Sequence, residues 1–482
     1  MEPYAHRAVV RYLHLLIAKI DRKKRFKKVS YRKQSFYIYV SYRLYMIESR
    51  ILRGVVAEAL SMVPPDAFER DIGININLNK VIVLAGIRRS GKTYELYNIM
   101  NGLLRKKVPR ANLFYMNFED ERLRGLGIDQ LDELIKIYYE LSGAAKEHKI
   151  YLFLDEVQNI NGWAQWVRRL YDSTLYKIFV TGSSSKLLSR EIATALAGRN
   201  VTYTVYPLSF KEFLGIKGIK LDSKQFYAKR RVFNRHLYEY LRMGGFPEVS
   251  LIEDQNDKIR VLSSYYDAIA YRDVIERYKV RDTNALSMTF RYAISTYAKS
   301  FSATKTYNYF KSIGIGISKK TINSFINYGE SVFLFYHLYK FSKSFKKLHQ
   351  SRKKIYVTDS GLLRLFENAE DYGRLLENAV CIELLRRKDK DPLLEISYLE
   401  GRDGEVDFAV SRYKKVIELI QVTFELNKSN EDRELGPLAS SLRELGAESA
   451  TVITFDSEGE RKIGGKIVSV IPFALWQCGA SD

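Results

Sequence analysis

A glycine-rich motif between an apolar run and a helical pattern constrains this 482-residue chain more than any other feature. The segment Gly86-Ile-Arg-Arg-Ser-Gly-Lys-Thr93 fits the pattern G-x-x-x-x-G-K-[ST], and the apolar run Val81–Ala85 precedes it. Glycines let backbone N–H groups curl around a phosphate, and the following helix directs the positive end of its dipole to the same point. The motif predicts a strand, a phosphate-binding loop (the P-loop, residues 86–93) and a helix, in that order.

The chemistry of this motif assigns a role to each of its polar residues. We expect Lys92 to reach the β- and γ-phosphates of ATP and the Thr93 hydroxyl to bind Mg²⁺. The remaining residues expected to contact the nucleotide complete the loop: Gly86, Arg88, Arg89, Ser90 and Gly91.

Two carboxylates end a second apolar run, Tyr151-Leu-Phe-Leu-Asp155-Glu156. Parallel strands deliver such residues to the carboxyl edge of the sheet, where the P-loop also lies. We expect Asp155 to hold Mg²⁺ through water, and Glu156 to orient and deprotonate the attacking water. A third run ends in Thr181-Gly-Ser-Ser-Ser185, so that Ser183 or Ser184 is a candidate sensor of the γ-phosphate. A loop that only turns the chain is the alternative for these serines.

Strand and helix patterns alternate from Lys80 onward, with further apolar runs at Asn112–Asn117 and Lys177–Thr181. Continuous apolar strands separated by helices indicate a parallel sheet covered on both faces, so we expect a doubly wound α/β fold. Residues 208–300 have mainly helical patterns, and the chain returns to mixed α/β patterns after residue 361. The first 45 residues differ in composition, and we expect either a basic extension or a native start at Met46.

Positive charge is concentrated in two segments of a chain whose formal net charge is +22. Residues 1–45 hold 12 Lys and Arg against two acidic residues, and residues 311–354 hold 10 against Glu330 alone. Such clusters favour polyanions through counterion release, which makes nucleic acid the leading partner and an anionic membrane surface the second. A solvated basic face without a partner is the alternative.

Composition also excludes several classes of protein. Two cysteines cannot form a disulfide framework, and no apolar run approaches the length of about 18 residues that spans a membrane. The six histidines show no metal-ligand spacing, and no Ser-His or Cys-His catalytic pattern emerges. We therefore expect a cytoplasmic protein without a membrane span.

A series of motifs in a fixed order identifies a family that this chain resembles. Besides the P-loop and Asp155–Glu156, the series comprises Ala-Gly-Arg199, Tyr-Pro-Leu-Ser-Phe-Lys-Glu-Phe213, Gly-Gly-Phe-Pro-Glu248 and Tyr-Arg-Asp273. It resembles archaeal and bacterial AAA+-type ATPases that carry a C-terminal domain of unknown function. The resemblance implies an ATPase core over residues 46–207, a helical lid over 208–300, a winged helix over 301–360 and a nuclease-like domain over 361–482. It also implies that Arg199 and Arg272 contact the γ-phosphate within one subunit or from a neighbouring one; surface salt bridges are the alternative.

The basic segment has the element order of a winged helix. Two helical patterns separated by a break at Ile313–Ile317 are followed by the apolar runs Val332–Tyr339 and Lys354–Thr358, with a basic loop between them. Ser318 is the expected cap of the second helix. In a winged helix this second helix enters the major groove and the loop contacts phosphates, which predicts non-specific duplex DNA binding. The candidate residues are Lys319, Lys320, Lys343, Lys346, Lys347, Arg352 and Lys353. A partner protein is the alternative ligand.

The terminal region resembles the PD-(D/E)XK nucleases, in which a helix acid, a strand Asp and an acid-x-Lys pair hold Mg²⁺ and activate water. Glu383 and Asp407 match the first two positions. The third departs from the pattern, because Gln421-Val-Thr423 lacks both the acid and the lysine. We expect an inactive or strongly weakened nuclease fold that binds a substrate or partner.

Three functions are consistent with these observations. The first is an ATPase that couples its nucleotide state to DNA or a partner protein, either as a monomer or as an oligomer. The second is a nuclease gated by ATP, and the third is a binding protein that uses ATP as a switch with negligible turnover.

Overall fold

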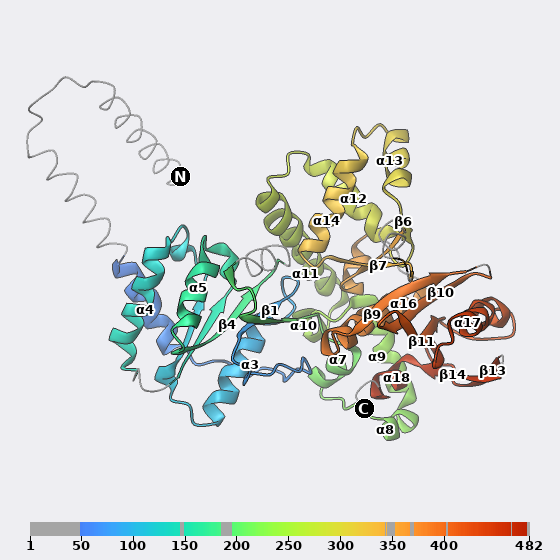
Figure 1. The fold of residues 1–482 in the computed structure, drawn as a ribbon, viewed down its shortest axis with the longest axis horizontal. Coiled ribbons are helices and arrows are strands. Elements are labelled where there is room, and N and C mark those ends of the chain that lie inside the picture. Colours follow the sequence, from blue (N-terminus) through green and yellow to red (C-terminus); the bar gives the residue numbers. More distant parts are fainter. Residues whose placement is uncertain are drawn as a thin grey trace, which may run out of the picture.

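A computed structural model describes residues 49–144, 149–184, 195–342, 344, 352–366, 371–401, 403–463 and 465–479. The expected N-terminal extension, the alternative start and Lys343, Lys346 and Lys347 lie outside these ranges. Figure 1 shows two sheet-containing parts at opposite ends of the molecule, with helices between them.

The first sheet has five parallel strands in the order β2-β3-β4-β1-β5. The strands are β1 (Val81–Ala85), β2 (Leu113–Asn117), β3 (Ile150–Asp155), β4 (Tyr176–Gly182) and β5 (Asn200–Thr204). The first four begin and end within one residue of the apolar runs that predicted them. The doubly wound α/β core is confirmed.

Helices cover both faces of this sheet, because alternate residues of its strands point to opposite sides. Ile82 and Leu84 belong to a buried cluster with α3 (Lys92–Arg105). Val81 and Val83 belong to the large core cluster, which also contains buried residues of α4 (Ile128–Ser142), α5 (Trp163–Asp172) and the helix over residues 49–61.

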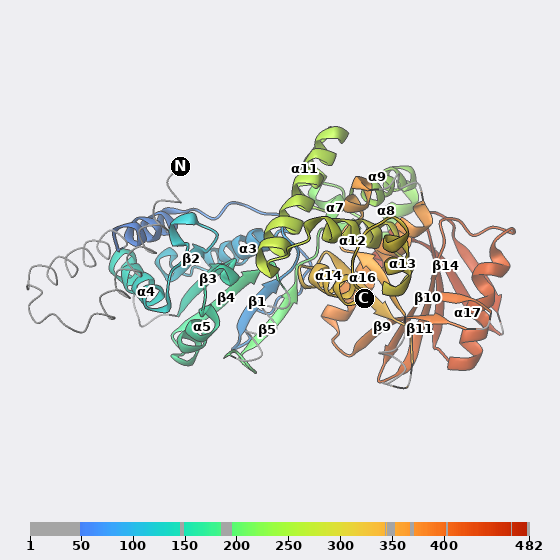
Figure 2. The ribbon, with the colours of Figure 1, turned by 90° about the horizontal axis from the view of Figure 1, so that it is seen from above.

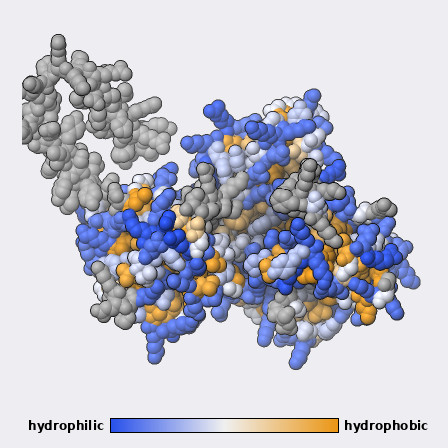
Figure 3. All heavy atoms as spheres, in the orientation of Figure 1, coloured by the Kyte–Doolittle hydropathy of each residue, from blue (hydrophilic) through white to orange (hydrophobic). Residues whose placement is uncertain are grey.

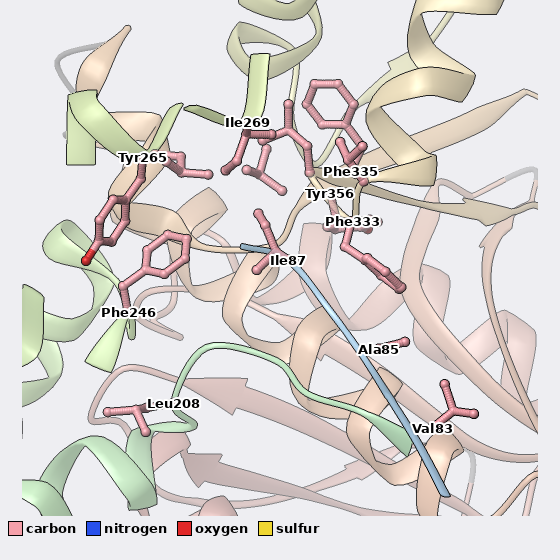
Figure 4. Packing of buried hydrophobic residues seen from close by; sticks show 14 of the residues in the cluster. Val83, Ala85, Ile87, Leu208, Phe246, Tyr265, Ile269, Phe333, Phe335 and Tyr356 are labelled. Atoms are coloured by element: carbon pink, nitrogen blue, oxygen red, sulfur yellow. The ribbon is translucent and has the colours of Figure 1, made fainter. Parts of the chain in front are cut away.

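A helical region follows the sheet and lies between the two ends of the molecule in both views (Figures 1 and 2). It comprises α7 (Phe210–Ile216), α8 (Ser223–Ala228), α9 (Arg230–Met243), α10 (Pro247–Leu251), α11 (Gln255–Ala268) and the π-helix η4 (Ile269–Glu276). In Figure 4, Ile87 of the P-loop is drawn below Ile269 of η4 and to the left of Phe333 and Tyr356 of the following unit. All four belong to the large buried cluster, and Arg88 of the P-loop donates hydrogen bonds to Asp273 of η4, so the P-loop contacts the helical region.

The next unit contains a small antiparallel sheet with the strand order β6-β8-β7. We call residues 283–357 the three-stranded unit; its elements are α12 (Thr283–Ser295), β6 (Ser300–Phe301), α13 (Ala303–Ser312), α14 (Lys319–Ser331), β7 (Phe335–Tyr339) and β8 (Lys353–Val357). The Ser318 side chain accepts a hydrogen bond from the Thr321 N–H over 3.0 Å, as expected of a cap. The expected boundary at residue 301 stays a prediction; buried residues of α12 and α14 belong to one cluster.

The C-terminal part is a six-stranded sheet in the order β13-β14-β12-β11-β10-β9. We call residues 372–479 the six-stranded unit; its elements are α16 (Tyr372–Lys390), β9 (Leu394–Glu400), β10 (Glu405–Arg412), β11 (Lys415–Val422), α17 (Glu431–Leu445), β12 (Ser449–Thr454), β13 (Gly459–Ile463), β14 (Lys466–Pro472) and α18 (Phe473–Gly479). Phe408 and Ile420 share a buried cluster with residues of α16, whereas Ala409 and Leu419 share one with α17. The two long helices therefore cover opposite faces of this sheet.

A buried carboxylate joins the helical region to the segment after β8. Asp359 accepts hydrogen bonds from the N–H groups of Gly245 over 2.7 Å and Gly361 over 2.9 Å. A Cβ added to Gly244, whose φ is 77°, would lie 1.7 Å from Asp359 Oδ1, so this position requires glycine. Burial raises the pKa of Asp359 to about 7, even though both N–H groups favour its ionised form. The Gly-Gly-Phe-Pro-Glu motif thus has a structural role.

The surface is mostly hydrophilic on the face seen in Figure 3, with apolar residues scattered among charged ones. No helix within the described ranges is both long enough and apolar enough to cross a membrane.

Asn378 of α16 ties this helix to β8 through two hydrogen bonds to one residue. Its Oδ1 accepts from the Val357 N–H, and its Nδ2 donates to the Val357 oxygen, each over 2.9 Å. We predict that Asn378→Ala lowers the free energy of unfolding by about 2–5 kcal/mol, because each unsatisfied buried backbone group costs about 1–3 kcal/mol. Urea unfolding of the full chain measures the loss. Lys388→Ala, at an exposed position of the same helix, is the control, and equal stability of the two variants would contradict the prediction.

Candidate nucleotide site and C-terminal carboxylate cluster

The P-loop connects β1 to α3 in a conformation that its glycines permit. Gly91 precedes the helix with φ of 100°, in the left-handed region. A Cβ added to Gly86 would lie 2.2 Å from the main-chain oxygen of Val205, so no larger residue fits there. The Ser90 hydroxyl is buried and has no hydrogen-bond partner within the described part of the chain.

Lys92 lies at the centre of the loop and is 4% exposed. Its Nζ donates to the main-chain oxygens of Gly86 over 3.2 Å and Ile87 over 3.1 Å, and it lies 3.5 Å from Glu156 Oε1. The ammonium is thus held at the point that the loop encircles.

Glu156 is buried and adopts φ of 53°, an uncommon conformation for a residue with a Cβ, and one that clusters at functional sites. Burial acts to raise the pKa of its carboxyl, but Lys92, a hydrogen bond from Gln158 and Arg88 outweigh burial and lower it. Glu156 therefore stays ionised at neutral pH. Gln158 Nε2 donates to Glu156 Oε2 and also to Ser183 Oγ, the latter over 3.3 Å.

Asp155 at the end of β3 is the acceptor for three hydroxyl groups. Thr93 Oγ1 and Tyr115 Oη donate to its Oδ2 over 2.7 and 2.9 Å, and Thr181 Oγ1 donates to its Oδ1. Burial first, and then the nearby Glu156 charge, raise the pKa of Asp155, while the three hydroxyls oppose the rise. A divalent cation beside Asp155 would favour its ionised form.

The arrangement brings together four of the predicted residues: Lys92, Thr93, Asp155 and Glu156. Ser183 joins them through Gln158. Sequence reasoning missed Tyr115 and Gln158 as members of the site. Tyr115 lies two residues before the end of β2, and only its pairing with Phe153 of β3 shows that it reaches Asp155.

The donor set of this site suits a magnesium nucleotide. A hydroxyl and a carboxylate are hard oxygen ligands of the kind that Mg²⁺ takes, and Thr93 and Asp155 already lie within a hydrogen bond of each other. Lys92 and the N–H groups that follow Gly86 can hold the phosphates.

The two arginines of the P-loop face the helical region. Arg88 Nε and Nη2 each lie 3.1 Å from a different oxygen of Asp273 in η4, and its Nη1 lies 2.9 Å from Glu119. The Arg89 guanidinium lies 5.5 Å from the centre of the Tyr265 ring of α11. Their side chains therefore contact other parts of the protein, and the predicted contact of both residues with the nucleotide stays a prediction.

The two arginines singled out by the family resemblance lie in different places. Arg272 Nη1 is 3.0 Å from Glu119 Oε1, the atom that Arg88 also contacts, so it lies on the P-loop side of the sheet. Arg199 precedes β5 and pairs with Asp172 over 2.9 Å. It lies at the amino edge of the sheet, opposite the P-loop, which excludes contact with a phosphate of its own subunit in this arrangement.

The predicted acidic residues of the C-terminal part do not come together as expected. Asp407 Oδ2 accepts from the Val422 N–H over 2.9 Å, and Gln421 Oε1 accepts from the Asp407 N–H over 3.3 Å, so these two are neighbours. Glu383 is not near them, because it lies 3.5 Å from Arg386 at the junction with α7. The prediction that Glu383 is the helix acid is wrong, and Glu377, six residues earlier on α16, lies beside Asp407 instead.

A buried lysine from the three-stranded unit occupies the space between these carboxylates. Lys354 Nζ on β8 lies 3.1 Å from Glu377 and 3.7 Å from Asp407, and it also pairs with Glu405. Tyr356 Oη donates to Glu377 over 2.8 Å. We call Glu377, Glu405 and Asp407 the carboxylate cluster. These three side chains share the Lys354 ammonium group, whereas the motif Gln421-Val-Thr423 contains no lysine.

Charges in the carboxylate cluster perturb one another strongly. Burial raises the pKa of Asp407 and of Glu377, and Lys354 opposes the rise in both. The same carboxylates hold the pKa of Lys354 above its usual range, although burial opposes this. No group of three or more His, Cys, Asp or Glu side chains in the described ranges has the geometry of a metal site, so the cluster as placed does not fit Mg²⁺.

The candidate DNA-binding residues within the described ranges lie at two places on the three-stranded unit. Lys319 and Lys320 form the exposed first turn of α14, and Lys319 Nζ lies 5.5 Å from the Tyr307 ring. Arg352 is exposed beside β8, and Lys353 Nζ lies 5.2 Å from the Tyr339 ring.

Comparison with known proteins matches two parts of the chain to family models. Residues 78–214 match a model described as an AAA domain, and residues 234–387 match one described as a domain of unknown function (DUF8612). "Uncharacterized protein MJ1544" of Methanocaldococcus jannaschii is 36% identical over 439 residues, which cover 89% of this chain and 96% of that protein. An "Uncharacterized protein" of Haemophilus influenzae is 31% identical over 354 residues, which cover 73% of this chain and 84% of that protein.

Among solved structures, the Aeropyrum pernix ORC1 protein in complex with DNA is similar with 14% identity and a TM-score of 0.26, over 70% of this chain and 94% of that one. A likeness at this level carries no inference about this chain. The AAA domain match and the parallel sheet together support an AAA-type ATPase module.

Removing the Lys354 ammonium should leave buried carboxylates without a counter-charge. We predict that Lys354→Met lowers the free energy of unfolding by about 3–5 kcal/mol at pH 8 and by less at pH 5. A carboxyl whose pKa is raised on folding stabilises the fold at low pH, and this contribution is lost as pH rises through the raised value. Without Lys354 the pKa values of Glu377 and Asp407 rise further, which makes the loss at high pH larger.

Urea unfolding at both pH values checks this prediction. Lys353→Met removes a neighbouring lysine outside the cluster and serves as the control. A loss that does not depend on pH would show that the ammonium does not compensate these carboxylates.

Proposed function

Since this chain belongs to the family of these archaeal and bacterial proteins and carries an AAA domain, we propose that it binds ATP with Mg²⁺ at the P-loop and hydrolyses it. The contact that carries this proposal is the 2.7 Å hydrogen bond between Thr93 and Asp155, which sets two magnesium-type ligands side by side. Lys92 and Glu156 lie 3.5 Å apart at the same edge of the sheet.

In this proposal Lys92 and the loop N–H groups bind the phosphates, and Thr93 and Asp155 hold Mg²⁺. The metal ion, when bound, neutralises charge that develops on the phosphate oxygens. Glu156 is ionised and accepts a proton from the attacking water. Gln158 bonds to Glu156 and Ser183, and it fixes the direction in which this carboxylate points.

Side chains of the P-loop contact the helical region, so a change in the P-loop on nucleotide binding can alter the position of that region. Arg88 makes a bidentate contact with Asp273 in the π-helix, and Ile87 belongs to the same buried cluster as Ile269 of that helix. Single-turn π-helical segments frequently occur at functional sites. We propose that movement of the P-loop on ATP binding shifts η4 and the units that follow. We also propose that Arg272, which pairs with Glu119 on the P-loop side of the sheet, approaches the γ-phosphate within one subunit, whereas Arg199 would need a neighbouring subunit in an oligomer.

We propose that the three-stranded unit is a winged helix and that it binds duplex DNA without strong sequence preference. Its order of elements, helix, strand, two helices and two strands with the sheet order β6-β8-β7, agrees with that fold. The exposed lysines begin α14, the helix that would enter the major groove. A partner protein is the alternative ligand of this surface.

The six-stranded unit has the order helix, three strands, helix, strand of a nuclease-like fold, and we propose that it binds rather than cuts. The Lys354 ammonium is the counter-charge of the carboxylates that would otherwise attract a divalent ion. The ATP-gated nuclease is therefore the less favoured candidate.

Two substitutions separate ATP binding from hydrolysis. We predict that Lys92→Ala abolishes ATP binding, because the loop loses its only buried ammonium within the described residues. Glu156→Gln should keep ATP binding and slow steady-state phosphate release about 100-fold or more, as loss of a general base does. Lys106→Ala, an exposed position at the end of α3, is the control. Wild-type phosphate release at background rates would favour the switch with negligible turnover, and normal release by Glu156→Gln would refute its role as base.

DNA binding is tested by reversing charges on the three-stranded unit. We predict that the triple variant Lys319→Glu, Lys320→Glu and Arg352→Glu binds duplex DNA about 10-fold or more weakly and with a smaller salt slope, because it contacts fewer phosphates. A triple reversal at exposed lysines elsewhere, Lys106, Lys136 and Lys388, controls for net charge. Fluorescence anisotropy at several salt concentrations measures both quantities.

Equal affinities of these two variants would exclude this surface as the DNA-binding one. The same duplex incubated with Mg²⁺ or Mn²⁺ should stay intact on a gel, and cleavage that Asp407→Asn abolishes would favour the nuclease instead.

A further inference from the structure

Arg70 lies against the outer side of the P-loop, and its side chain is only 5% exposed. Its Nη1 donates to the main-chain oxygen of Ser90 over 2.9 Å. A Cβ added to Gly91 would lie 3.7 Å from the same nitrogen, so the guanidinium is packed directly on the turn of the loop. The contact with the Ser90 oxygen comes from outside the P-loop motif, because Arg70 precedes β1 in the chain.

The position of this contact determines where a neighbouring N–H group points. In a trans peptide the C=O and the N–H of one peptide unit point in opposite directions. A guanidinium that holds the Ser90 oxygen from outside therefore turns the Gly91 N–H toward the inside of the loop, where a phosphate accepts hydrogen bonds.

Glu212 on α7 fixes the orientation of Arg70. The Arg70 Nε and Nη2 atoms donate to the two Glu212 oxygens over 3.0 and 2.8 Å, a bidentate pair that defines the plane of the guanidinium. Glu212 Oε2 also accepts from the Ser209 N–H over 2.8 Å, so the start of α7 holds this carboxylate. Burial acts to raise the pKa of Glu212, but Arg70 and Arg386 lower it to about 2, which keeps the carboxylate charged.

A second guanidinium approaches Glu212 from the six-stranded unit. Arg386 Nη1 on α16 lies 3.8 Å from Glu212 Oε2, and its Nη2 donates to the main-chain oxygen of Pro207. Arg70 Nη2 donates to that same oxygen over 3.3 Å. The Arg386 guanidinium also lies 4.9 Å from the centre of the Tyr206 ring. Arg70, which precedes β1, and Arg386 on α16 thus share the Glu212 carboxylate and the Pro207 carbonyl oxygen. Arg70 also contacts the P-loop.

We propose that Arg70 is a positioning residue of the nucleotide site, and that Arg386 completes its support from the C-terminal part of the chain. This inference rests on the proposed binding of ATP. It adds that the six-stranded unit controls the affinity of the P-loop for ATP. Loss of Arg386 leaves the Glu212 charge with one partner instead of two in a buried place, so that Glu212 and Arg70 hold the Ser90 peptide less firmly.

The experiment compares four forms of the full chain: wild type, Arg70→Met, Arg386→Met and Lys390→Met. Lys390 is the matched control, because it also lies on α16 and pairs across the same junction with Asp71 over 2.9 Å, but both of these side chains are exposed. In the presence of Mg²⁺, we expect the ATP dissociation constant to rise about 10-fold or more in Arg70→Met, several-fold in Arg386→Met and less than 2-fold in Lys390→Met. KM should rise in parallel while kcat stays near its wild-type value, because neither arginine touches the reacting atoms.

Amide hydrogen exchange without nucleotide gives a readout that does not depend on turnover. The peptide containing residues 86–93 should exchange faster in Arg70→Met and Arg386→Met than in Lys390→Met. Wild-type ATP affinity in Arg70→Met would overturn the positioning role, and identical behaviour of Arg386→Met and Lys390→Met would overturn the control by the six-stranded unit.

If Arg70→Met does not fold, Glu212→Gln tests the same support and should raise the dissociation constant; an unchanged constant would overturn the proposal. Failure of the wild-type chain to bind ATP would refute the proposed function itself, which is a different outcome.

Discussion

The parallel pairing of β1 with β4, and of β4 with β3, is the constraint on which the rest of the structure depends. In a parallel sheet the carboxyl ends of neighbouring strands lie at one edge, so the turn after β1 and the acids after β3 meet there. This pairing brings Lys92 within reach of Glu156 and lets Thr93 donate to Asp155. The parallel pairing of β5 with β1 puts Arg199, which precedes β5, at the opposite edge.

Buried charges join the other parts of the chain to this sheet. Glu212 receives guanidinium groups from before β1 and from α16, and Lys354 of β8 is surrounded by carboxylates of the six-stranded unit. Breaking a buried pair leaves an uncompensated charge, which costs far more than loss of a surface ion pair. Separating the units would leave these charges without their partners, so the buried pairs couple the parts of the chain to one another.

Local patterns predicted which residues meet at the candidate nucleotide site, but not which ones meet in the C-terminal cluster. The P-loop is contiguous, and the pairing of strands that end in polar residues follows a general rule, so residues 86–93 and Asp155–Glu156 could be placed without coordinates. The helix acid was misplaced at Glu383, because the motif allows several positions along a helix. Six residues are about one and two-thirds turns, so Glu377 and Glu383 lie on different faces of α16 and reach different partners. Only Glu377 faces Asp407.

The amino-acid sequence by itself determined the α/β core, the glycine-rich loop after β1, the acids at the end of β3 and the concentration of positive charge near residues 311–354. These features depend on residues that are adjacent in the chain or on the period of a strand or helix. Tertiary structure alone decided that Tyr115 bonds to Asp155, that Arg70 and Arg386 share Glu212, and that Lys354 enters a cluster whose own motif lacks a lysine. A buried charge needs a counter-charge at a point in space and not at a fixed spacing in the chain. Any element that packs there can supply it, and for this reason such partners leave no local signal.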